Sequence, residues 1–217
     1  MTDAPQVPLK PHLRGWLHLG AFPLALVTGG LLTVLAPHGS ARAALAVFAV
    51  SAALLFGVSA LYHRGTWGPR AHGVLKRLDH ANIFLIIAGT YTPFAVLLLH
   101  PGPARVLLWV VWTGAVGGVA LRVLWVGAPR WLYVPVNIAL GWVAVIYLPD
   151  FAAAGPAVLA LVVAGGLLYT LGGVVYGLRR PDPSPRWFGF HEVFHALTVL
   201  AFGAHCAGLA LAVTTTT

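Results

Sequence analysis

The sequence predicts an all-α membrane protein, a bundle of seven transmembrane helices. Of the 217 residues, 59% are hydrophobic and only 8% are charged, whereas soluble domains carry about 25% charged residues. Apolar runs close to the roughly 20 residues that cross a bilayer as a helix recur along the chain. The mean hydropathy of +0.86 agrees with this composition, and one membrane domain accounts for the whole length.

Residues 1–14 are polar, contain three prolines and predict a flexible cytoplasmic tail. The transmembrane domain is expected at residues 15–213, and residues 214–217 are expected to form a second short tail. Its seven helices are expected at residues 19–36, 43–62, 81–99, 106–121, 131–148, 157–178 and 196–213.

A signal peptide is the alternative interpretation of the first run, because Lys10 and Arg14 precede it. Pro37, directly after the run, is a poor context for cleavage, and Pro23 lies within it. A spanning helix is therefore favoured here. The second run leads directly into His63.

Three of the later runs depart from a plain apolar helix. Pro93 is expected to bend the third helix, which membrane helices tolerate when their neighbours satisfy the freed backbone groups. The fourth run is short unless it continues past Arg122 to Val126, and the fifth contains Pro135 and Asn137.

The last two runs differ in what they carry. The sixth contains glycine pairs at residues 165–166 and 172–173, which favour close helix packing, although glycine is also simply frequent in membrane helices. The seventh begins directly after the stretch His191-Glu192-Val193-Phe194-His195.

The distribution of basic residues predicts the orientation of the bundle. Seven spans place the termini on opposite sides, and the side that carries more Lys and Arg in short loops is normally cytoplasmic. Of the 13 basic residues, two are assigned to one side, namely Arg42 and Arg105. The other eleven are Lys10, Arg14, Arg64, Arg70, Lys76, Arg77, Arg122, Arg130, Arg179, Arg180 and Arg186. The N-terminus is therefore expected in the cytoplasm and the C-terminus outside.

The net charge of +8 is expected to serve topology and contact with anionic lipids at the cytoplasmic loops, not nucleic-acid binding. This follows because the basic residues fall between apolar runs. Cys206 is the single cysteine, which excludes an intramolecular disulfide and a multi-cysteine metal site.

His191 and His195 are four residues apart, so they lie on one face of a helix with the spacing that lets two imidazoles hold one metal ion. Interfacial polarity is the alternative explanation of such a pair. His63 ends the second helix at the same depth and Asp79 opens the third. Ser59 lies one turn deeper than His63, and three histidines with one water make a tetrahedral catalytic zinc site.

The polar residues near this point have structural alternatives. Asp79 is interpreted either as a site residue or as the N-cap of the third helix, and Glu192 as a cap of the seventh. Ser59 is expected, in the alternative, to bond to the carbonyl four residues earlier. His80 should face elsewhere, and His205 lies about 15 Å beyond His195 along the helix, too far to share an ion. The remaining histidines are interpreted as tail, interface or loop residues, namely His12, His18, His38, His72 and His100.

Four stretches carry a resemblance to a known family: residues 59–63 (SALYH), 78–80 (LDH), 88–93 (AGTYTP) and 191–195 (HEVFH). The sequence resembles the hemolysin III family, the bacterial branch of the progestin and adipoQ receptors, which is similar in turn to the alkaline ceramidases. The resemblance covers nearly the whole chain.

The resemblance implies a seven-helix protein of the bacterial inner membrane with zinc held by His63, His191 and His195. It also implies that Asp79 acts on the zinc-bound water with Ser59 beside it. Zinc-dependent hydrolysis of a lipid amide or ester is the first hypothesis, with a membrane lipid or acyl chain as ligand. The second is a non-catalytic, zinc-stapled protein of membrane-lipid homeostasis or sensing. A pore-forming hemolysin is the third, and the apolar helices disfavour it.

Overall fold

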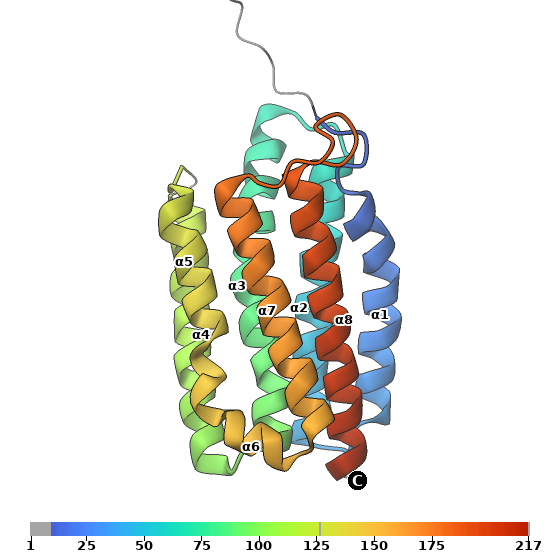
Figure 1. Cartoon of the computed structure of the whole chain (residues 1–217), viewed down its shortest axis with the longest axis vertical. Coiled ribbons are helices and arrows are strands. Elements are labelled where there is room, and N and C mark those ends of the chain that lie inside the picture. Colours follow the sequence, from blue (N-terminus) through green and yellow to red (C-terminus); the bar gives the residue numbers. More distant parts are fainter. Residues whose placement is uncertain (1–9, 126, 217) are drawn as a thin grey trace, which may run out of the picture.

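The computed structural model describes residues 10–125 and 127–216, and this part of the chain is an all-helical bundle (Figure 1). Seven of its helical segments are long and apolar enough to cross a membrane. The protein is therefore an integral membrane protein, as its composition predicts. The elements in order are α1 Trp16–Leu35, α2 Ser40–Arg64, α3 Pro69–Leu98, α4 Pro101–Leu124, α5 Arg130–Gly141, η1 Val143–Tyr147, α6 Leu148–Ala153, α7 Pro156–Leu178 and α8 Phe190–Thr216.

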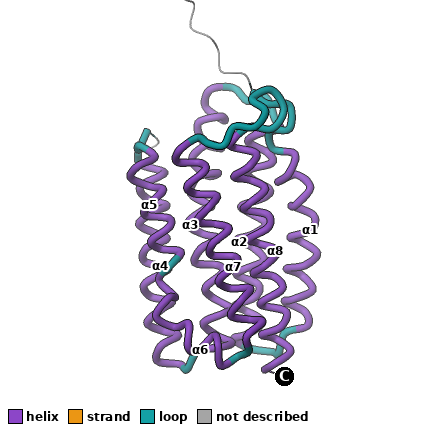
Figure 2. The backbone as a smooth tube through the Cα atoms, viewed as in Figure 1, coloured by secondary structure: helices purple, strands orange, loops and turns teal. Residues whose placement is uncertain are grey.

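The helix α3 occupies the centre of the bundle. It packs against α2, α4, α5 and α8, and it has the largest buried share of the seven spans. The helix α1 packs on α2 and α8, and α8 packs along α7. Loops lie at the two ends of the bundle (Figure 2). The start of α1, the end of α2 and the start of α8 therefore meet at one end (Figure 1).

The third helix begins much earlier than expected. Pro69 stands in its first turn, where proline is favoured because its missing N–H would be unpaired anyway. Asp79 consequently lies inside α3, and the interpretation of Asp79 as a helix N-cap is wrong. Arg70, Lys76 and Arg77 are helical residues as well. The apolar run alone did not reveal this polar first part of the helix.

The fifth span is broken, whereas a single helix was expected at residues 131–148. The helix α5 contains Pro135 and ends at Gly141, and η1 and α6 complete the span. Tyr91 of α3 stabilises the broken segment through two hydrogen bonds. Its hydroxyl donates to the carbonyl of Gly141 over 2.5 Å and accepts from the N–H of Ala144 over 3.2 Å. Backbone groups that the break frees are thus satisfied inside the membrane.

The fourth span extends further than its apolar run. The helix α4 continues to Leu124 and includes Arg122, whose guanidinium lies 4.2 Å from the centre of the Tyr133 ring. This buried cation–π contact explains how an arginine expected in a loop is held within a helix. Val126, the other residue of the predicted extension, lies outside the described residues.

The two predicted tails are described only in part. Residues 1–9 lie outside the described residues, but His12 and Leu13 donate backbone hydrogen bonds to the carbonyls of Arg186 and Trp187 in the loop between α7 and α8. At the other terminus, α8 continues through residue 216, and Thr217 is not described.

Candidate metal centre

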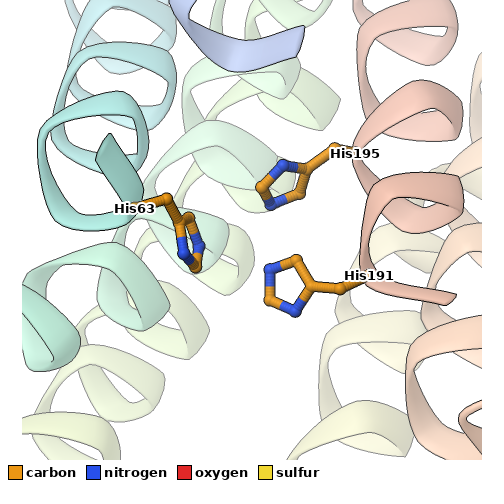
Figure 3. A group of neighbouring side chains, drawn as sticks. All are labelled: His63, His191 and His195. Carbon is orange, nitrogen blue, oxygen red and sulfur yellow. The ribbon is translucent and has the colours of Figure 1, made fainter. Parts of the chain in front are cut away.

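His63, His191 and His195 converge at the end of the bundle where α2 ends and α8 begins. One nitrogen atom from each ring lies within 4.8 Å of the other two. Figure 3 shows the three rings directed toward one another, His63 from α2 and the other two from α8. The three residues are buried or half-buried. The structure thus brings together the three histidines that the sequence predicts.

The rings fit a metal ion by their donor chemistry. His63 Nε2, His191 Nε2 and His195 Nδ1 are buried and have no hydrogen-bond partner among the described residues. Buried polar atoms are normally paired, so unpaired nitrogens on three converging rings fit a ligand that the rings share. Ligand nitrogens of one tetrahedral zinc at 2.0–2.1 Å lie roughly 3.4 Å apart, so a small closing movement would suffice.

The first turn of α8 is fixed by carboxylates, which places His191 and His195. Asp182 accepts a hydrogen bond from the N–H of Phe190, and Glu192 accepts one from the N–H of Gly189, each over 2.8 Å. Negative side chains are favoured at this positive end of a helix. The predicted capping role of Glu192 is confirmed.

Glu192 also forms an ion pair that the sequence did not predict. Its carboxylate receives a hydrogen bond from Arg14, and Glu192 itself is almost fully buried. This pair joins the segment before α1 to the first turn of α8. The chain before α1 is therefore part of the framework of the metal centre.

Asp79 lies next to the histidines. Its Oδ2 is 3.8 Å from His63 Nε2, a separation beyond direct hydrogen bonding. Ser59 lies beside the Asp79 carboxyl. The Ser59 oxygen is buried without a well-formed hydrogen bond in the described part of the chain. The expectation that Ser59 bonds to a carbonyl four residues earlier is therefore wrong.

His18 belongs to this site, although it was interpreted as a tail, interface or loop residue. Only 2% of its surface is exposed, and its ring stacks on that of His195 with 3.7 Å between centroids. Both of its nitrogens are buried and unpaired within the described residues. The sequence signal for it is an ionisable residue directly before an apolar run, because membrane helices rarely carry such a residue without a function.

Gly15 lets α1 approach His63 closely. Its φ of +83° suits glycine, and a Cβ atom at this position would lie 2.7 Å from His63 Cβ. A side chain here would push the start of α1 away from the end of α2. Gly15 is thus a local requirement for the packing beside the metal centre.

Two other histidines of the spans lie outside the triad, as expected. His80 Nδ1 is 2.6 Å from the carbonyl of Lys76, and its Nε2 is 3.3 Å from the Tyr176 hydroxyl. His205 lies further along α8, where its Nε2 is 3.3 Å from the carbonyl of Val162.

Cations gather beside the site. Lys10 lies near Arg64 and Arg14, and its pKa is lowered by partial burial and by the repulsion of these two cations.

A mostly apolar cavity, open on one side, adjoins the candidate metal centre. Ser59, Asp79 and His18 line it near the histidines, and α3, α5, α7 and α8 supply most of its wall. Lining residues on α3 extend from Asp79 to Phe94, which corresponds to about 22 Å along the helix at 1.5 Å per residue. The cavity is long and apolar, with polar groups at the metal end.

Comparison with known proteins shows the same kind of sequence over most of the chain. The family model described as "Haemolysin-III related" matches residues 7–206. Hemolysin-3 of Bacillus cereus is 33% identical over 142 residues, which are 64% of this chain and 64% of that protein. The hemolysin-3 homolog of Bacillus subtilis (strain 168) is 34% identical over 164 residues, which are 74% of this chain and 76% of that protein.

Proposed function

Because this chain belongs to the haemolysin-III related family, and its three histidines converge beside a carboxylate and an apolar cavity, we propose that it hydrolyses a lipid amide or ester with the help of zinc. The observation that carries the proposal is the position of Asp79 and Ser59. They lie at the metal centre and also line the cavity. One end of a bound lipid would therefore meet the catalytic groups. We place the protein in the bacterial inner membrane.

His63, His191 and His195 would hold the ion, since their buried nitrogens are otherwise unpaired. When bound by three neutral imidazoles, zinc lowers the pKa of a coordinated water from about 15.7 to about 7 and polarises a carbonyl oxygen. The stacked ring of His18 keeps the ring of His195 in place.

Asp79 and Ser59 supply the proton chemistry. The Asp79 carboxylate accepts the proton of the attacking water, and Ser59 holds that water through a second hydrogen bond. After attack, protonated Asp79 returns the proton to the amine or alkoxide that leaves. Both side chains sit away from bulk solvent, where a fixed hydrogen-bonding arrangement has its largest effect.

The apolar wall of the cavity binds the acyl chain. Ile83, Ile87 and Phe94 continue along α3 from Asp79, so a chain bound in the cavity places its carbonyl at the metal end. Burial of each methylene group stabilises such a complex by about 0.8 kcal/mol. Substrate selection then depends on the depth and shape of this wall.

The test is release of fatty acid by the purified protein in lipid, with zinc content measured in parallel. Asp79→Asn keeps the shape of the side chain and removes the base. We expect it to retain zinc and to lose at least about 100-fold in rate, as general-base removal typically does. Wild-type protein that releases no fatty acid from ceramides, acyl amides or phospholipid esters in a metal-dependent way would refute the hydrolase.

A non-catalytic role in membrane-lipid homeostasis or sensing is the second candidate, and one observation favours it. The triad links α2 to α8, although α2 packs mainly on α1 and α3, and α8 mainly on α7. An ion between α2 and α8 would thus join two parts of the bundle. Retained zinc without turnover would favour this role. A pore has the least support, because the wall of the cavity is mostly apolar.

A further inference from the structure

A second polar cluster lies deep in the cavity, ten residues along α8 from His195. It consists of Thr90 on α3, Tyr169 on α7 and His205 on α8, which all line the cavity. Thr90 and His205 are each 8% exposed. The Thr90 Oγ1, the Tyr169 hydroxyl and the His205 Nδ1 are buried without hydrogen-bond partners among the described residues. Three polar atoms without partners in the described part of the chain thus belong to residues that line the cavity.

The His205 ring has a defined orientation and a defined hydrogen-bonding character. Its Nε2 lies 3.3 Å from the carbonyl of Val162. A carbonyl only accepts, so Nε2 carries the proton and Nδ1 is left as an acceptor. Gly165 makes this orientation possible, because a Cβ atom there would lie 2.3 Å from His205 Nε2.

Tyr169 completes the cluster. Its ring centre lies 5.7 Å from that of His205. The phenol both donates and accepts hydrogen bonds. A ligand group that donates to His205 Nδ1 and also pairs with the Tyr169 hydroxyl satisfies both atoms, and a neutral hydroxyl does this. A charged group does not suit the site, since Asp79 is the one charged side chain among the described lining residues and lies at the metal end.

The distance between the two polar sites fixes where the ligand carries its hydroxyl. Ten helical residues separate His195 from His205, which is about 15 Å. An extended alkyl chain with bonds of about 1.5 Å advances about 1.25 Å per bond. A chain with its carbonyl at the metal centre therefore reaches the cluster after about 12 carbon–carbon bonds.

We propose that the cavity selects acyl lipids that carry a hydroxyl group near the middle of the chain, recognised by Tyr169 and His205. The proposal rests on one part of the proposed function, namely that an acyl chain enters the cavity with its carbonyl at the metal centre. It does not depend on hydrolysis. Thr90 borders the same space and narrows the range of positions that the hydroxyl can take.

A binding experiment tests the proposal with the full-length protein in lipid nanodiscs. A fluorescent fatty acid is displaced by octadecanoic acid, by 12-hydroxyoctadecanoic acid and by 2-hydroxyoctadecanoic acid. We expect the 12-hydroxy acid to bind about 3–10-fold more tightly than octadecanoic acid, the effect of one net hydrogen bond. The 2-hydroxy acid, with its hydroxyl beside the carboxylate, should not show this gain.

Two variants assign the gain to the cluster. His205→Phe and Tyr169→Phe keep an aromatic ring and remove the hydrogen-bonding atoms, so each should bring the ratio between the two acids close to one. Tyr133→Phe is the matched control. It removes a hydroxyl that is paired with Tyr176, and it should leave the preference unchanged.

Three results would overturn the proposal, and they are distinguishable. Equal affinity of wild type for all three acids would mean that water satisfies the cluster, while the hydrolase proposal would stand. If both variants still bind the 12-hydroxy acid more tightly than octadecanoic acid, groups other than His205 and Tyr169 bind the hydroxyl. Failure of every acid to bind would remove acyl occupancy of the cavity as well. Loss of hydrolysis in Asp79→Asn bears on none of these measurements.

Discussion

Replacement of His63 by alanine should lower the zinc content of the protein and its melting temperature. The ring of His63 comes from α2, and the rings of His191 and His195 come from α8. The helix α2 packs mainly on α1 and α3, and α8 packs mainly on α7. His63→Ala removes the one ligand that α2 contributes. The remaining two histidines, both on α8, bind an ion much more weakly and do not link it to α2. A ligand that binds only the folded state stabilises it according to its concentration relative to Kd.

The size of the effect follows from this relation. At a free zinc concentration 100 times the Kd, the ion contributes about 2.7 kcal/mol. For a chain of this length, 1 kcal/mol shifts Tm by about 2–4 °C. Loss of zinc from wild type should therefore lower Tm by about 5–11 °C. The Tm of His63→Ala should lie near this lower value even before a chelator is added.

The assay is thermal unfolding in detergent micelles with and without a chelator, together with zinc content by mass spectrometry. The chelator should lower Tm of wild type and of His72→Ala, an exposed histidine at the same end of the bundle, but not that of His63→Ala. An equal chelator effect on wild type and on His63→Ala would refute the assignment of the ion to this site.

Three further predictions concern the framework of the site. A reporter that matures only outside the cytoplasm should be active when fused after Thr217, because of the eleven-to-two distribution of basic residues; activity only from a fusion at the N-terminus would reverse the topology. Glu192→Gln should lower the free energy of unfolding by about 2–4 kcal/mol in denaturant titration, since it leaves Arg14 without its buried partner; a change below the error of the titration would contradict this account. Gly15→Ala should reduce zinc occupancy and Tm, because its Cβ would lie 2.7 Å from His63 Cβ at a φ of +83°. Gly20→Ala is the control and should behave as wild type, because a Cβ atom there meets nothing within 4 Å. An equal loss of zinc and Tm in both variants would argue against the close approach of Gly15 to His63.

Features that depend on neighbouring residues in the chain were predictable from the sequence. The apolar runs gave the seven spans because length and hydropathy are local properties. The spacing of His191 and His195 follows from the helical repeat, and alternation of the spans brought His63 to the same end. The structure confirms the seven spans and the convergence of the three rings.

Features that depend on packing between helices were not predictable in the same way. The start of α3 at Pro69 lies in a polar, basic stretch that hydropathy excludes from the span. The break of the fifth span depends on hydrogen bonds from Tyr91, which is distant in sequence. His18 joins the site only because α1 packs on α8. No local pattern records such contacts.

The most direct test of the account is an anomalous difference map at the zinc absorption edge from crystals of the protein grown in lipid. The account predicts one peak per chain, bounded by nitrogens of His63, His191 and His195, with Asp79 on its open side. A peak at another group of residues, or no peak in crystals that contain zinc, would contradict it.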